Sequence, residues 1–150
     1  MALDRLVSFL RRHRRVALDT SVFIYQLEAN ARYVSLSDHI FAWVEQAGHG
    51  AVTSTITMTE LLVHPYHDPD RERVDSVYGT FSQYPNLNWI APDLEIADLA
   101  ALLRARYRLK TADALQAATA VSANVPALVT NDRIFRRVEM LETLVLDELL

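Results

Sequence analysis

The sequence contains no cysteine, and its 150 residues include only three glycines, five prolines and one lysine. Without cysteine the chain can form neither a disulfide nor a thiolate metal site, which fits a reducing compartment. No run approaches the ~18 apolar residues of a membrane span. The N-terminal segment also lacks the long apolar core of a signal peptide. We therefore expect a soluble cytoplasmic protein with no membrane association.

The rest of the composition is that of one globular domain. Hydrophobic residues make up 51% of the chain and charged residues 23%, an ordinary balance for a packed core. A chain of this length can bury most of its apolar surface in a single domain. No repeat and no low-complexity linker divides it, so residues 1–150 are expected to form one unit.

The charge is uneven although the net charge is only −4. All but one of the 15 basic residues are arginine, and they cluster in "RRHRR" (11–15), "RARYRLK" (104–110) and "DRIFRR" (132–137). Arginine matches phosphate with two parallel hydrogen bonds, so these clusters could hold a nucleic-acid backbone. They could equally be solvated helix faces and helix ends.

Short apolar segments alternate with helical patterns along the chain. This alternation predicts an α/β fold in which a short parallel sheet carries helices on both faces. A basic helix within residues 1–15 precedes the first strand. The expected strands are 16–19, 51–53, 86–91, 126–132 and one beginning at 143. The expected helices are 3–13, 21–29, 36–47, 55–63, 69–83, 93–106 and 112–124.

Local signals predict three of the helix boundaries. Pro65 should end the helix that begins near residue 55, because the residue before a proline disfavours the helical conformation. Asp68 followed by Pro69 should open the next helix. Thr111 is expected to cap the alanine-rich helix after it.

Four acids lie at or close to the ends of predicted strands and helices. Asp19 follows "VAL" and Asp132 follows "ALVTN", and in open α/β sheets ligands bind beyond the carboxyl ends of the strands. Asp113 lies in the first turn of a helix, where an ionised carboxylate is favoured. Glu60 is the one acid in the apolar and hydroxylic segment "TITMTELL" and lacks an i,i+4 cation. Each acid also has a simpler explanation, such as helix capping for Asp19.

A shared location would give the four acids a common role. Four carboxylates at one sheet edge repel one another unless a cation lies between them. Oxygen ligands alone suit a hard divalent ion such as Mg²⁺ or Mn²⁺. Such a site typically activates water and stabilises a phosphodiester under attack.

The segments that carry these acids resemble a known family. "ALDTSVFIY", "TSTITMTELL", "TADALQAATA" and "LVTNDRIF" are similar, in this order, to the four acidic blocks of the PIN-domain family. Within it they most resemble the VapC-type toxin ribonucleases of bacterial toxin–antitoxin pairs. The blocks span residues 16 to 135, which is nearly the whole chain.

The resemblance implies a Mg²⁺- or Mn²⁺-dependent endoribonuclease that cuts single-stranded RNA. Asp19, Glu60 and Asp113 match the family's three core acids and Asp132 the fourth, as metal ligands and catalytic residues. Ser21 and Thr130 fall where the family often has a supporting hydroxyl or amide. It also implies a homodimer and an antitoxin protein as partners.

Other residues have two interpretations. Arg133, beside Asp132, is a candidate contact to the substrate phosphate or else a surface residue. A metal role for His64 or His67 is disfavoured, because His64 directly precedes Pro65. Trp43 and Trp89 lie in apolar patterns and are expected in the core. The apolar helices "SVFIYQLE" and "DHIFAWVEQA" predict either an exposed groove for self-association and an antitoxin segment or simply more core.

Competing enzyme classes fit poorly. A dehalogenase-like phosphatase needs a second aspartate two residues after Asp19, where Ser21 stands. No glycine-rich phosphate loop ending in Gly-Lys and no nucleophile elbow is present. The alternative is a module of the same fold that binds nucleic acid or assembles without cleaving. Cleavage that depends on a divalent ion separates the two hypotheses.

Overall fold

Five short strands form one parallel sheet with the order β3-β2-β1-β4-β5, as the alternation of elements predicts. The computed structural model describes residues 1–150. The strands are β1 (Arg15–Leu18), β2 (Gly50–Ser54), β3 (Leu87–Ile90), β4 (Ala127–Thr130) and β5 (Glu142–Val145). The helices are α1 (Ala2–Arg11), α2 (Thr20–Glu28), α3 (Val34–Glu45), α4 (Ile56–His67), α5 (Arg71–Ser82), α6 (Leu94–Tyr107) and α7 (Thr111–Ser122), with short 3-10 helices η1 (Arg133–Arg137) and η2 (Leu146–Leu149).

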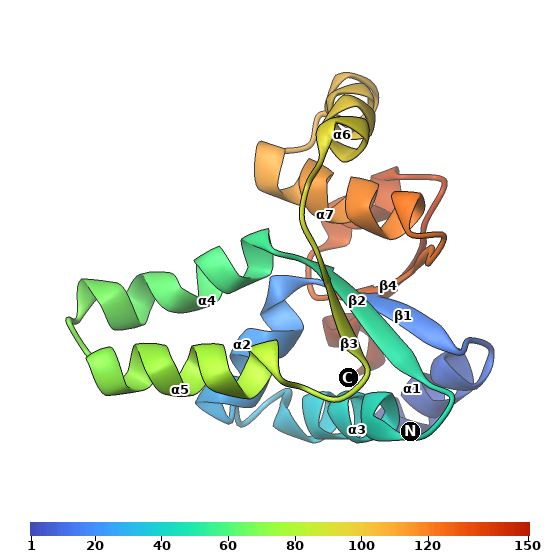
Figure 1. The fold of residues 1–150 in the computed structure, drawn as a ribbon. Coiled ribbons are helices and arrows are strands. Elements are labelled where there is room, and N and C mark those ends of the chain that lie inside the picture. Colours follow the sequence, from blue (N-terminus) through green and yellow to red (C-terminus); the bar gives the residue numbers. More distant parts are fainter.

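The sheet separates two hydrophobic layers. Val16 and Leu18 of β1 face a core that they share with α1, α2, α3 and α5. Ala17, between them, faces the second core, which α6 and α7 cover. Successive strand residues point to opposite faces, so burial of the whole strand needs helices on both sides. Figure 1 shows α6 and α7 on one side of the sheet and α3 on the other, with α4 and α5 projecting as a hairpin.

The three predicted helix boundaries are wrong. Helix α4 continues through Pro65 to His67; the proline removes one backbone hydrogen bond, but its ring is buried and the helix packs along α5. Asp70, and not Asp68, caps α5 by accepting a hydrogen bond from the Arg73 backbone N–H at 3.0 Å. Lys110 is the N-cap of α7 and Thr111 is its first residue.

The apolar side chains of α2 and α3 fill the core. Phe23 of α2 packs edge-on against Phe41 of α3 and Phe81 of α5. The core interpretation therefore holds for Phe23 and Phe41, whereas Ile24 and Leu27 of α2 are partly buried and line a hollow against α4 and α5, so an apolar groove near these helices stays a prediction. Trp43 is buried and Trp89 packs beside Phe23, as expected. Exposed large hydrophobic side chains occur on α1, α4, α5 and α6. None of the helices is both long and apolar enough to cross a membrane.

Candidate active site

The four predicted acids come from four elements that meet at the carboxyl edge of the sheet. Asp19 directly follows β1, and Asp132 follows β4, which pairs with β1. Glu60 comes from α4 after β2, and Asp113 from α7. The acids are close enough to interact electrostatically: Asp113 and Glu60 both raise the pKa of Asp19, and Asp132 and Glu60 both raise that of Asp113.

Asp19 is both a helix cap and a member of this cluster. It is the N-cap of α2, and its Oδ1 accepts a hydrogen bond from the Thr20 backbone N–H at 2.8 Å. Its Oδ2 accepts a second bond from the Thr130 hydroxyl at 2.7 Å. Burial nevertheless raises the pKa of this carboxyl to about 6, with Asp113 and Glu60 adding to the rise. The two hydrogen bonds do not compensate for the loss of water, so the ionised group is held at a cost.

Asp113 has a milder version of the same environment. It lies in the first turn of α7 and is half-buried. Burial raises its pKa first, the charges of Asp132 and Glu60 raise it further, and Lys110 lowers it. Lys110 is thus the cation that acts on this acid, and sequence reasoning had placed it only within a basic cluster.

A buried set of side chains orients Glu60. The Thr20 hydroxyl lies 2.7 Å from Glu60 Oε1. Gln116 of α7 donates from Nε2 to Thr57 Oγ1 at 2.6 Å and lies 3.4 Å from Thr20 Oγ1. Thr20, Thr57 and Gln116 are all buried, at 5%, 0% and 4% exposed. The side chain of Glu60 itself reaches solvent, so one end of the network is the site.

The direction of these bonds follows from the positions of the hydrogens. Thr53 donates its only hydroxyl hydrogen to the carbonyl of Leu18 at 2.8 Å. Thr57, 2.8 Å from Thr53, must therefore donate to it and accept from Gln116. The hydroxyl hydrogen of Thr20 is then free for Glu60, which acts as an acceptor.

Sequence reasoning missed Thr20, Thr57 and Gln116 as supporting residues. A usable signal was present, because Thr57 precedes Glu60 by three positions and Gln116 follows Asp113 by three. Residues three apart share a helix face. A hydroxyl and an amide one turn from the acids therefore had to lie near them.

Thr130 and Ser21 have different roles from each other. The Thr130 hydroxyl donates to Asp19 and accepts a bond from the Asp132 backbone N–H at 3.0 Å, so it joins two of the acids. Ser21 Oγ instead accepts a bond from the Asn131 backbone N–H at 3.2 Å. Ser21 therefore holds the loop after β4 against α2 and makes no side-chain hydrogen bond to any of the four acids.

Arg133 pairs with two acids outside the cluster. It is exposed, and its guanidinium lies 3.7 Å from Asp147 and 3.6 Å from Glu148 at the C-terminal end of the chain. Asp132, beside it, accepts a hydrogen bond from the Ile134 backbone N–H at 3.0 Å and begins η1. Asp132, Arg133 and Asp147 border one open cleft of about 390 Å³, so Arg133 stands at the rim of the acidic region.

The order of these elements and acids matches one family. The model of the PIN domain matches residues 16–141, which include all four acids. The chain belongs to the PIN-domain family. Helix α1 lies before the matched region. No curated protein matches the chain.

Solved structures share this PIN fold at low sequence identity. VapBC2 from Rickettsia felis bound to a promoter DNA fragment is 20% identical with a TM-score of 0.67, over 87% of this chain and 98% of that one. A toxin–antitoxin complex from Klebsiella pneumoniae is 23% identical with a TM-score of 0.66, over 87% and 97%. VapBC-1 from nontypeable Haemophilus influenzae is 18% identical with a TM-score of 0.67, over 89% and 98%.

In this PIN domain the donor set suits a hard cation, although the acids are not drawn tightly together. No three histidine or carboxylate side chains, His64 and His67 included, are gathered closely enough to hold a metal ion as they stand. Glu60 and Asp132 are exposed and Asp113 is half-buried, so these three side chains have room to turn. Asp19 is held by two hydrogen bonds. Carboxylate oxygens with no nitrogen or sulfur fit Mg²⁺ or Mn²⁺.

Proposed function

We propose that this protein is a divalent-metal-dependent endoribonuclease that cleaves single-stranded RNA, and that it is the toxin of a toxin–antitoxin pair in the cytoplasm. The observation that carries the proposal is the carboxylate cluster around Asp19. Asp19 is 9% exposed, and its pKa is raised to about 6. A cap alone needs no second, third and fourth carboxylate near it. Ionised carboxylates that cost free energy in the free protein are expected in a cation site, because the bound ion offsets their repulsion.

The chain's own residues divide the work of such a site. Asp19, Glu60, Asp113 and Asp132 would hold the ion, with Thr130 and Thr20 fixing the orientation of Asp19 and Glu60. When bound, Mg²⁺ or Mn²⁺ supplies a Lewis acid that lowers the pKa of water and offsets phosphate charge. Lys110 lies near Asp113, which supports it as a contact to the RNA backbone.

The partner proposals rest on the family. Three of the solved structures with this fold come from toxin–antitoxin systems, which supports an antitoxin protein as partner. A homodimer stays a prediction from the family resemblance. Val63 and Tyr66 of α4 and Tyr78 of α5 are exposed, so the projecting hairpin is the apolar surface on which either contact would be sought.

The test of the function is an RNA cleavage assay. End-labelled single-stranded RNA should be cut by the purified protein in Mg²⁺ or Mn²⁺ and left intact in EDTA, because the acids act through the ion. The alternative, a module that binds without cleaving, predicts bound but uncut RNA in both conditions. Cleavage that continues unchanged in EDTA would contradict the metal-dependent mechanism.

Arg133 has its own expected effect on RNA binding. Arg133→Ala should weaken binding to all RNA sequences and reduce the slope of log K against log salt by about one, since each phosphate contact releases counterions. Filter binding in EDTA at several salt concentrations measures this. The matched control is Arg71→Ala. Arg71 lies on α5 and, like Arg133, is an arginine that pairs with an acid of the chain. If both variants keep the wild-type slope, Arg133 serves only its ion pairs with Asp147 and Glu148.

A further inference from the structure

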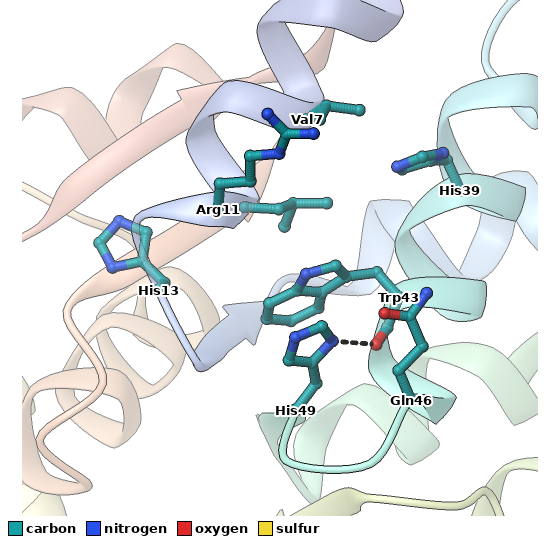
Figure 2. Close-up of a pocket in the computed structure, with 8 residues that line it drawn as sticks. Val7, Arg11, His13, His39, Trp43, Gln46 and His49 are labelled. Carbon is teal, nitrogen blue, oxygen red and sulfur yellow. Dashed lines mark hydrogen bonds between the residues drawn. The ribbon is translucent and has the colours of Figure 1, made fainter.

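A second cavity lies at the opposite edge of the sheet from the acids. It has a volume of about 320 Å³ and lies between α1 and α3, as Figure 2 shows. His13 and His49, which line it, stand just before β1 and β2, whereas Asp19 and Glu60 follow those strands. Four or five strand residues span about 15 Å. A group bound in this cavity is therefore outside the reach of the acids.

One wall of the cavity comes from outside the shared PIN domain. Helix α1 supplies Val7, Leu10 and Arg11, and the PIN match begins only at residue 16. Three buried side chains of α1, Leu6, Phe9 and Leu10, pack into the main core, which holds the helix in place. The cavity therefore depends on a helix outside the matched PIN domain, and the proposed function assigns no role to that helix.

Hydrogen-bond donors without partners converge on this space. Neither the Arg11 guanidinium nor the side chains of His39 and Gln46 make a hydrogen bond or ion pair within the chain, whereas the neighbouring Arg12 pairs with Glu142. In Figure 2 Arg11 and His39 flank the cavity from facing helices, and the indole of Trp43 lies below them in the view, beside His49. The lining includes no aspartate or glutamate.

The two tryptophans differ in whether the indole N–H has a hydrogen-bond partner in the chain. Trp89 donates its indole N–H to the carbonyl of Phe81 at 3.0 Å. The indole N–H of Trp43 has no partner in the chain and keeps access to solvent, although the residue as a whole is only 7% exposed, and it lines the cavity. An indole N–H is a donor only, so a ligand that satisfies it must bring an acceptor.

The remaining histidines do not turn the cavity into a metal site. His49 donates from Nδ1 to the Trp43 carbonyl at 2.8 Å and stacks on the indole, with ring centres 4.2 Å apart. Its neutral form therefore supplies no donor to the cavity, and its role is to fix Trp43. His13 lies 3.1 Å from Glu142 and points away in Figure 2. No three of the histidines could hold a metal ion together.

We propose that this cavity binds a phosphate monoester through Arg11, His39 and the indole N–H of Trp43. Arginine matches phosphate with two parallel hydrogen bonds, and the other donors are neutral or positive. The volume of about 320 Å³ lies at the lower end of small-molecule sites and leaves room for the group that carries the phosphate. Arg14 and Arg15 follow α1, are exposed and have no ion pair, so they extend the positive surface outward. The monoester is either a free nucleotide or the 5′ end of an RNA.

The test uses the full chain in EDTA at constant ionic strength, so that the acidic site takes no part. Inorganic phosphate, a nucleoside 5′-monophosphate and a short RNA with either a 5′-phosphate or a 5′-hydroxyl are titrated while the two indole N–H signals are followed by NMR. We expect the Trp43 signal to shift saturably and the Trp89 signal to stay in place. Arg11→Ala should weaken phosphate binding about tenfold, and Arg106→Ala, which removes an unpaired arginine from α6, should leave it unchanged.

The same titrations identify the source of the phosphate and can overturn the site. Tighter binding of the 5′-phosphorylated RNA than of the mononucleotide assigns the cavity to RNA ends, and the reverse order assigns it to nucleotides. No saturation below about 10 mM of any probe, a stronger response from Trp89 than from Trp43, or equal affinity of Arg11→Ala and wild type would each refute the proposal. None of these outcomes depends on whether the acids cleave RNA.

Discussion

Asp113→Asn should lower the rate of Mg²⁺-dependent RNA cleavage at least about a hundredfold, because even residues that only support metal ligands typically change activity 10- to 100-fold. Asparagine keeps the size of the side chain but removes one negative charge from the cluster. The charges of Asp132 and Glu60 raise the pKa of Asp113, so Asp113 is one of the interacting carboxylates whose charge the ion would neutralise. Single-turnover cleavage of labelled RNA, with circular dichroism to verify the fold, measures the effect.

Asp98→Asn is the control for this loss. Asp98 is an exposed acid of α6 with no ion pair, and its replacement makes the same chemical change away from the cluster. The control should cleave at the wild-type rate. If Asp113→Asn also cleaves at that rate, the activity resides in another site or in a contaminant.

Asp19→Asn should stabilise the protein in the absence of metal. The pKa of Asp19 is raised from 3.8 to about 6, and two pKa units correspond to about 3 kcal/mol against the ionised form. For a domain of this size that predicts a rise in melting temperature of roughly 5–10 °C at pH 7.5. Asparagine remains a good N-cap, and its amide can still bond the Thr130 hydroxyl, so little is lost.

The pH dependence gives the sign of the effect. With a raised pKa, the folded protein holds the Asp19 proton more tightly than the unfolded chain does. The stability of the wild type should therefore fall as pH rises from about 4 to about 6 and level off above that range. Asp19→Asn and wild type should melt together near pH 4 and separate as the pH increases. Asp98→Asn should follow the wild-type curve throughout.

Added Mg²⁺ should stabilise the wild type more than Asp19→Asn. Binding of Mg²⁺ to the folded state alone raises the melting temperature of the wild type, and the loss of one carboxylate in Asp19→Asn should shrink this gain. Differential scanning calorimetry of both proteins in EDTA and in millimolar Mg²⁺ compares the four cases. Equal melting temperatures in all four would leave Asp19 as a helix cap and remove the support for a metal site.

Much of the architecture follows from local patterns in the sequence. Buried strands such as β1 and β4 are short apolar runs, and the helices between them show their own periodicity, so the parallel α/β order was predictable. The positions of Asp19 and Asp132 followed from the same order, because parallel strands end at one edge. Pro65 shows the limit of this reasoning. Its local preference to end a helix is overridden by the burial of its ring in α4.

The fold class and the family could be predicted from neighbouring residues and chain order, and the same patterns single out the four acids as candidates. The surroundings of the acids, in contrast, arise only from the packing of the folded chain. The Thr130–Asp19 bond joins residues 111 positions apart and the Gln116–Thr57 bond residues 59 apart. The same packing also turned Arg133 toward Asp147 and brought Arg11 of α1 to the same cavity as Trp43 of α3. Such side chains come into contact only after the helices have packed on the sheet. Local sequence patterns therefore do not determine the distances between them.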